Sequence, residues 1–150
     1  MKIKVALSLA LGMLILNSVG AQNKDLFQLA IDGSPQQLRQ AIRNGADIKV
    51  RNKYGETVLM TAAGNNQDPA VISLLLDEGA ELNARDRFGE TALMHAASTS
   101  HNPQVIDALL RAGADGKVRS AAGETAFEYA RSNRFLDGSE VFWKLADAQY

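Results

Sequence analysis

The stretch RDRFGETALMHAAS, residues 85–98, decides the fold because it occurs in three versions at a fixed interval. RNKYGETVLMTAAG, residues 51–64, precedes it, and RSAAGETAFEYARS, residues 119–132, follows it. Each version carries the triplet Gly-Glu-Thr, and successive triplets are 34 residues apart. A period of about 20 to 50 residues is the signature of a stacked array of structural repeats.

Two further markers keep the same period. The first is a Gly-Ala pair followed by an acidic residue, which begins at Gly45, Gly79 and Gly113. The second is a proline, at Pro35, Pro69 and Pro103. Three independent markers in one register indicate a true repeat.

The first half of one unit predicts a turn followed by a helix. DRFG, residues 86–89, has Asp at the first and Gly at the fourth position of a turn, as turn chemistry favours. Thr91 is suited to cap a helix N-terminus, since its hydroxyl can accept a hydrogen bond from the first helical turn. Leu93, Ala96 and Ala97 then form one apolar stripe at helical spacing, and the two alanines allow a second helix to approach closely.

The second half of the unit predicts another helix. Asn102 is a candidate N-cap, and Pro103 fits the first helical position, where its missing N–H costs nothing. The apolar stripe of this helix consists of Val105, Ile106, Leu109 and Leu110. Gly113 follows the helix, as glycine often does at a C-terminus. One such unit buries too little apolar surface to fold alone, so stacking between neighbours must stabilise it.

The repeats resemble the ankyrin repeat. DRFGETALMHAA and NKYGETVLMTAA are similar to the family pattern D-x-x-G-x-T-P-L-H-x-A-A, and GAELNARD is similar to G-A-D-x-N-A-x-D. Met60 and Met94 stand where the family has His, so the family's Thr–His hydrogen bond is missing and less rigid turns are expected. The resemblance implies an all-α solenoid of about four helix-turn-helix repeats, with approximate bounds 24–51, 52–85, 86–119 and 120–150.

The N-terminus is typical of a secretory signal peptide. Lys2 and Lys4 precede an apolar run over residues 5–16, and small residues lead to Ala21. We predict a cleaved signal peptide over residues 1–21 and a repeat domain over residues 22–150, the alternatives being an uncleaved anchor or a buried helix. Cleavage removes two basic residues and no acidic one, so the formal net charge moves from −1 to −3. The corresponding location is the periplasm or the exterior of the cell.

Composition narrows the classes of partner. The chain has no cysteine, which removes disulfides and cysteine-based metal sites. It has no basic excess that would attract nucleic acid. We expect no cofactor, no membrane span after cleavage, and a monomer that binds a protein partner.

The hairpin tips and first helices supply the candidate binding residues. An aromatic beside a cation recurs at two successive tips, and such side chains are favoured in interfaces. The predicted partner-binding residues are Lys53, Tyr54, Glu56, Asn65, Arg87, Phe88, Glu90, His95, Ser98 and Thr99. The alternative for the aromatics is that each ring folds back over its own hairpin.

Two charged ladders also follow the repeat. One consists of Arg51, Arg85 and Arg119, and the other of Glu56, Glu90 and Glu124. Like charges about 10 Å apart in water repel by only about 0.4 kcal/mol, so either ladder is tolerated without a functional reason. We therefore favour solvated hairpin charges with local Arg–Glu pairs over a dedicated site.

Catalytic and metal chemistry find little support in the sequence. A zinc site needs three or four converging ligands, and no carboxylate at helical spacing accompanies His95 or His101. No motif for nucleophilic catalysis or phosphate binding is present. We predict no metal site, no catalytic residue and no enzyme.

The resemblance implies a protein–protein interaction module that binds through a concave face and its hairpin tips. Inhibition of, or immunity against, an exported enzyme is a special case of this function. The alternatives are a structural, self-associating module of the cell envelope, with an apolar patch around Trp143 and Tyr150, or a hydrolase with an improvised His/Glu site. A pocket shared by His95 and an acidic side chain, together with a perturbed pKa, would favour the hydrolase, whereas an open concave face with scattered polar groups favours binding.

Overall fold

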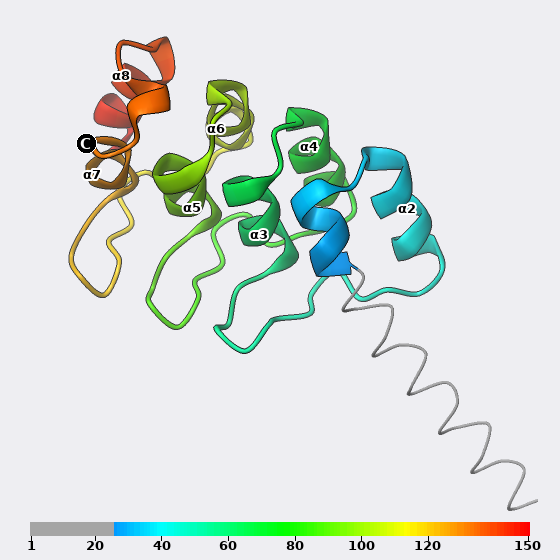
Figure 1. Cartoon of the computed structure of the whole chain (residues 1–150). Coiled ribbons are helices and arrows are strands. Elements are labelled where there is room, and N and C mark those ends of the chain that lie inside the picture. Colours follow the sequence, from blue (N-terminus) through cyan, green and yellow to red (C-terminus); the bar gives the residue numbers. More distant parts are fainter. Residues whose placement is uncertain (1–25) are drawn as a thin grey trace, which may run out of the picture.

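The structure is a computed structural model that describes residues 26–150, so the predicted signal peptide lies outside the described residues. The helices follow one another in pairs, and an extended loop joins each pair to the next (Figure 1). The first pair is a helix that includes residues 26–32 and α2 (Pro35–Arg43). The others are α3 (Val58–Asn65) with α4 (Pro69–Asp77), α5 (Ala92–Thr99) with α6 (Pro103–Arg111), and α7 (Ala126–Ala130) with α8 (Glu140–Ala148).

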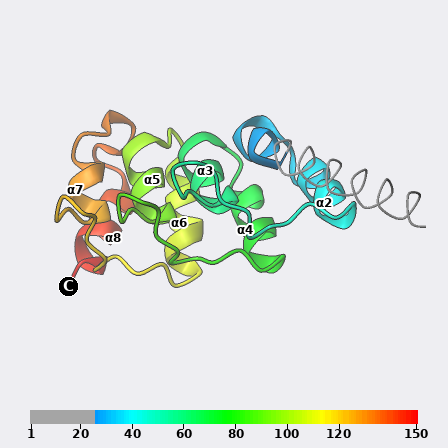
Figure 2. The same cartoon turned by 90° about the horizontal axis from the view of Figure 1, so that it is seen from below.

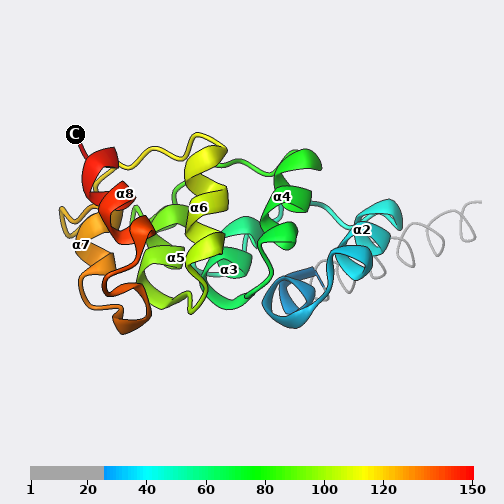
Figure 3. The same cartoon turned by 90° about the horizontal axis from the view of Figure 1, so that it is seen from above.

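The paired helices form two layers. Helices α3, α5 and α7 pack side by side in one layer, and α2, α4, α6 and α8 in the other, as the view in Figure 3 shows. Seen from below, the long loops lie under the first layer (Figure 2). The expectation of an all-α fold of paired helices is confirmed. Among residues 26–150, no helix combines the length and apolar character that crossing a membrane requires.

The helix boundaries follow the predicted capping residues. Thr57 and Thr91 accept hydrogen bonds from the backbone N–H of Met60 and Met94, at 3.3 and 3.4 Å. Thr57, Thr91 and Thr125 cap the first helix of three successive units, and all three are buried. They therefore lie at the same depth in a row, as a stacked repeat requires.

Glycine follows the second helix of the first three units because the chain turns there with positive φ. Gly79 and Gly113 have φ of 93° and 92°, a region that residues with a side chain rarely adopt. The amide of Ala114 donates to the Leu109 carbonyl at 3.0 Å, which satisfies an acceptor at the helix end.

The core lies between the two layers. Leu93, Ala96 and Ala97 are fully buried, as predicted, and so are Ile106 and Leu109. The predicted stripe of the second helices was wrong in detail. In α4 the predicted stripe is Val71, Ile72, Leu75 and Leu76. Leu76, like Leu110 in α6, is only half-buried against the core, whereas Leu74, outside this stripe, is 3% exposed. Helix α4 packs against α2 on one side and α6 on the other, so a residue outside the inward stripe is covered as well.

Asparagines connect successive loops at the far end of the helices. Asn66 Nδ2 donates to the carbonyl of Gly33 at 3.0 Å, and Asn102 Nδ2 to that of Gln67 at 2.7 Å. In the last unit the 3-10 helix η1 (Arg134–Leu136) replaces the proline start. There the buried Asn133 Nδ2 lies within hydrogen-bonding distance of the Ala97 and Ser100 carbonyls, at 3.0 and 2.9 Å.

Candidate partner-binding surface

Each hairpin loop is held by the side chain at its first turn position. Asn52 Oδ1 accepts hydrogen bonds from the amides of Tyr54 and Glu56, at 2.8 and 3.1 Å. Asp86 Oδ1 makes the equivalent contacts one unit later, with the amides of Phe88 and Glu90 at 2.8 and 2.9 Å. Asparagine and aspartate therefore hold the turn with the same pair of hydrogen bonds at this position.

Hydrogen bonds also join each hairpin to the next. The amide of Arg87 donates to the carbonyl of Tyr54 at 3.1 Å, and the amide of Ala121 donates to that of Phe88 at 2.8 Å. The three tips are therefore linked through their backbones. Such links restrict the tips before any partner arrives, which lowers the entropy cost of binding.

The arginine ladder reinforces these links. Arg51 Nη1 lies 2.9 Å from both the Gly55 and the Arg85 carbonyl oxygens. Arg85 repeats the contacts, with Nε 3.1 Å from the Gly89 carbonyl and Nη2 2.6 Å from the Arg119 carbonyl.

The expectation of local Arg–Glu pairs on this ladder holds only in part. Arg51 pairs with Glu81 at 3.3 Å and Arg119 with Glu128 at 3.7 Å. Arg85 forms no ion pair within residues 26–150 and donates to two backbone carbonyls, as Arg51 does in addition to its ion pair.

The tip aromatics are exposed. Tyr54 is 46% and Phe88 56% exposed, although each ring belongs to a hairpin that is well ordered by hydrogen bonds. Lys53 Nζ lies 4.8 Å from the centre of the Tyr54 ring, within the range of a cation–π contact. Arg87 is exposed beside Phe88. Two aromatic-cation pairs therefore lie on neighbouring tips, available to a partner.

The structure brings Glu56, Asp86, Glu90 and His95 together at the base of the hairpins, and we name them the central cluster. His95 Nε2 lies 3.1 Å from Asp86 Oδ2 and 3.6 Å from Glu90 Oε2. One ligand atom each of Glu56, Asp86 and His95 lies within 4.8 Å of the other two. The sequence analysis found no carboxylate at helical spacing from His95, and the carboxylates that the structure brings to it come instead from the hairpins.

Asp86 and Tyr129, which the sequence analysis did not select, complete the surroundings of the cluster. The Asp86 side chain is 1% exposed. Tyr129 on α7 donates its hydroxyl proton to Glu90 Oε1 at 2.6 Å. Burial, and next the hydrogen bond to Glu90, raise the pKa of Tyr129. The repeat offered a way to find Tyr129, because it is 34 residues after His95, although His95 contacts the hairpin of its own unit and Tyr129 contacts that of the preceding unit.

The remaining predicted residues lie at the other end of the first helices. Asn65 is exposed at the end of α3, where its Nδ2 donates to the Thr61 carbonyl at 2.8 Å. Thr99 Oγ1 lies 2.8 Å from the Gly64 carbonyl. Ser98 and Thr99 line a shallow pocket of about 380 Å³ together with His101 and Phe135, whose rings are 4.0 Å apart. The ten predicted residues therefore form three groups and not one site.

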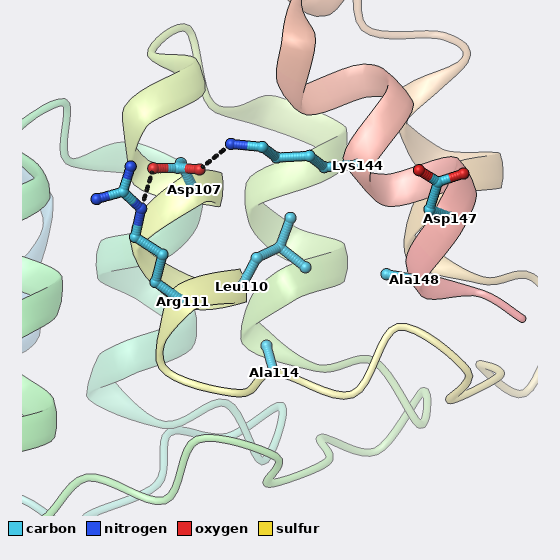
Figure 4. A pocket seen from close by; sticks show the side chains of 7 residues that line it. All are labelled: Asp107, Leu110, Arg111, Ala114, Lys144, Asp147 and Ala148. Atoms are coloured by element: carbon cyan, nitrogen blue, oxygen red, sulfur yellow. Dashed lines mark hydrogen bonds and ion pairs between the residues drawn. The ribbon is translucent and has the colours of Figure 1, made fainter.

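A larger pocket of about 480 Å³ lies between α6 and α8 (Figure 4). Asp107 bridges the two helices, with Oδ1 2.8 Å from Lys144 Nζ and Oδ2 2.7 Å from Arg111 Nε. The hydrogen bond from Lys144 lowers the pKa of Asp107 and raises that of Lys144. Because the basic groups of this pocket already pair with Asp107, we assign it a role in joining the last repeat to the array.

The turns keep part of the hydrogen bonding that the missing family histidine would supply. The Thr57 amide lies 3.3 Å from the sulfur of Met60, three residues later. In the last unit Glu128 accepts the Thr125 amide instead, and this hydrogen bond is the main cause of the lowered pKa of Glu128. The expectation of less rigid turns concerned the units of Met60 and Met94, and it stays a prediction.

Exposed aromatics also mark the C-terminal end. Trp143 is 62% and Tyr150 89% exposed. Phe142 contacts Trp143 edge to face, with ring centres 5.5 Å apart, and Phe127 at 5.1 Å.

Comparison with known proteins agrees with this architecture. The family model for ankyrin repeats in three copies matches residues 26–120 and 70–146. The chain therefore belongs to the ankyrin-repeat family, whose members are typically non-enzymatic modules that bind proteins. No curated protein matches the chain.

Proposed function

We propose that this chain binds one protein partner through its hairpin tips, with Tyr54 and Phe88 as the anchors. The observation that supports the proposal most directly is the pair of exposed rings on tips whose backbones are hydrogen-bonded to each other. Aromatic side chains on a restrained backbone supply contact area at low entropy cost. The neighbouring Lys53 and Arg87 favour a partner surface that combines apolar pockets with carboxylates.

The test is capture from an envelope extract with the full chain as bait. The double variant Tyr54→Ala, Phe88→Ala is expected to bind the captured partner at least tenfold more weakly, since each anchor contributes about 1–2 kcal/mol or more. Trp143→Ala is the matched control, because it removes an exposed aromatic from α8, away from the tips. Equal affinities of the tip variant and the native chain would overturn the proposal.

We also propose that the chain is exported and works in a periplasm or outside the cell. The support is the order of Lys2 and Lys4, an apolar run and Ala21 at the N-terminus. Expression in a Gram-negative host should yield a periplasmic product that begins at Gln22. A chain without residues 2–21 is the control and should stay in the cytoplasm, whereas equal distribution of the two chains would contradict export.

Within this function, inhibition of an exported enzyme is our more specific proposal. Linked hairpins make a rigid surface that can cover the mouth of an active-site cleft. An enzyme captured by the bait should lose activity with the native chain and keep it with the tip variant. Full activity in the saturated complex would leave scaffolding as the function.

His95 lies beside two carboxylates, as the hydrolase alternative requires, but the direction of these contacts does not favour that alternative. Its Nε2 faces Asp86 and Glu90, so carboxylates occupy the position where a nucleophilic hydroxyl would lie.

A further inference from the structure

The central cluster has a composition that protein binding does not require. Its three carboxylates surround one imidazole, and within residues 26–150 no lysine or arginine lies within ion-pair distance of Glu56, Asp86 or Glu90. The local charge therefore stays negative even with His95 protonated. A cation placed among these oxygens would relieve their mutual repulsion.

Repeat symmetry shows that the acidic residue and the histidine are not needed for folding. The position of Asp86 holds Asn52 one unit earlier and Ser120 one unit later, and Asn52 forms the same two backbone hydrogen bonds. The position of His95 holds Thr61 and Tyr129 in those units. Of these three units, only the one that contains Asp86 therefore has both a second side-chain acceptor oxygen and an imidazole at the two positions.

The side chains of the cluster are oriented by their neighbours. Asp86 Oδ1 is occupied by two amides, which directs Oδ2 toward His95 Nε2 at 3.1 Å. Glu56 Oε2 accepts a hydrogen bond from Asn52 Nδ2, and Glu90 is held by the hydroxyl of Tyr129. Outer hydrogen bonds of this kind orient the ligands of metal sites.

A buried hydroxyl of the preceding unit also lacks a hydrogen-bond partner. Thr61 Oγ1 forms no hydrogen bond with the described residues, as donor or as acceptor, although Thr61 is only 9% exposed. Thr61 holds, one unit earlier, the position of His95, since it follows Glu56 by five residues as His95 follows Glu90.

We propose that Glu56, Asp86 and His95 bind a divalent transition-metal ion, with Glu90 within reach as a fourth ligand. Imidazole with carboxylates is a donor set that zinc and its first-row neighbours accept. Two tetrahedral ligands of zinc lie about 3.4 Å apart, and the separations here, at most 4.8 Å, close with small side-chain movements. The ion replaces the proton that Nε2 and Oδ2 share, and that proton leaves to solvent.

The test is titration of the metal-depleted full chain with Zn²⁺, followed by calorimetry and by the ring resonances of the two histidines. We expect one equivalent to bind in the presence of excess Mg²⁺, and to shift the resonances of His95 but not those of His101. Absence of one-site binding, or a shift of His101 instead, would overturn the proposal.

Matched variants complete the test. Asp86→Asn keeps the hairpin contacts, as Asn52 does, and removes one ligand; His95→Gln removes another. Each should weaken Zn²⁺ binding at least tenfold, whereas His101→Gln should not. Thermal unfolding in a chelator shows whether the variants are folded. Folded cluster variants that bind as tightly as the native chain would exclude the site, and so would unchanged histidine resonances in the native chain.

Discussion

The side chain of Arg51 donates a 2.9 Å hydrogen bond to the main-chain carbonyl of Arg85, the corresponding residue of the next repeat. Arg85 makes the same contact with Arg119. A row of like charges can suggest a binding site, but these arginines join successive hairpins through hydrogen bonds. The arginine charge has a structural role because each guanidinium contacts two carbonyl oxygens at once.

The first prediction concerns these hydrogen bonds between successive hairpins. Arg85→Met removes two charge-assisted hydrogen bonds to carbonyls, so we expect a loss of about 1–3 kcal/mol in the free energy of unfolding, measured by urea denaturation. Arg87→Met is the control, because the Arg87 side chain forms no hydrogen bond or ion pair within residues 26–150 and methionine keeps the Cγ that lies next to Gly55. This change should cost under about 0.5 kcal/mol. Equal losses in the two variants would contradict the structural role of Arg85.

The second prediction concerns the core of the second helices. Leu109→Ala empties a fully buried site and should cost about 2–5 kcal/mol. Leu110→Ala on the same helix is only half-buried and should cost less. Denaturant midpoints of the two variants measure the difference, and the reverse order would show that the register of α6 is wrong.

The third prediction concerns the last repeat. Asn133→Ala leaves the carbonyls of Ala97 and Ser100 without their donor in a buried site, which should cost about 1–3 kcal/mol. Hydrogen exchange should then increase first in α7 and α8. Asn65→Ala, on the exposed end of α3, is the control and should leave exchange in α7 and α8 unchanged.

The fourth prediction concerns pH. The pKa of Asp107 is lowered in the folded chain, mainly by Lys144, so this carboxylate contributes stability above its ordinary pKa of 3.8. The contribution is lost as pH falls through the lowered pKa. Asp107→Asn should therefore be less stable than the native chain at pH 7, and the two should converge in acid. Thermal unfolding across this range measures the difference, and a constant gap would contradict the pairing.

Much of the fold could be predicted from the sequence because repeat proteins are built from local rules. The spacing of Gly-Glu-Thr triplets placed Thr57, Thr91 and Thr125 as helix caps, and proline and glycine marked the start and end of the second helices. Helix periodicity located Leu93 and Leu109 in the core. Their packing partners lie in the same unit or at equivalent positions of the next unit, so a local pattern is enough to predict their burial. Leu74 escaped prediction because its burial depends on two flanking helices at once.

The candidate site could be predicted from the sequence only in part. The exposure of Tyr54 and Phe88 agreed with their place at turn tips, but the sequence alone separated His95 from every carboxylate. Asp86 and Glu90 lie only nine and five residues before His95, yet no helical spacing connects them, because a hairpin intervenes and folds back onto the helix. The sequence by itself determined the repeat, its caps and its core. The tertiary structure alone decided which charges meet, because the hairpin folds back onto the helix of its own unit and stacking adds Glu56 from the preceding unit.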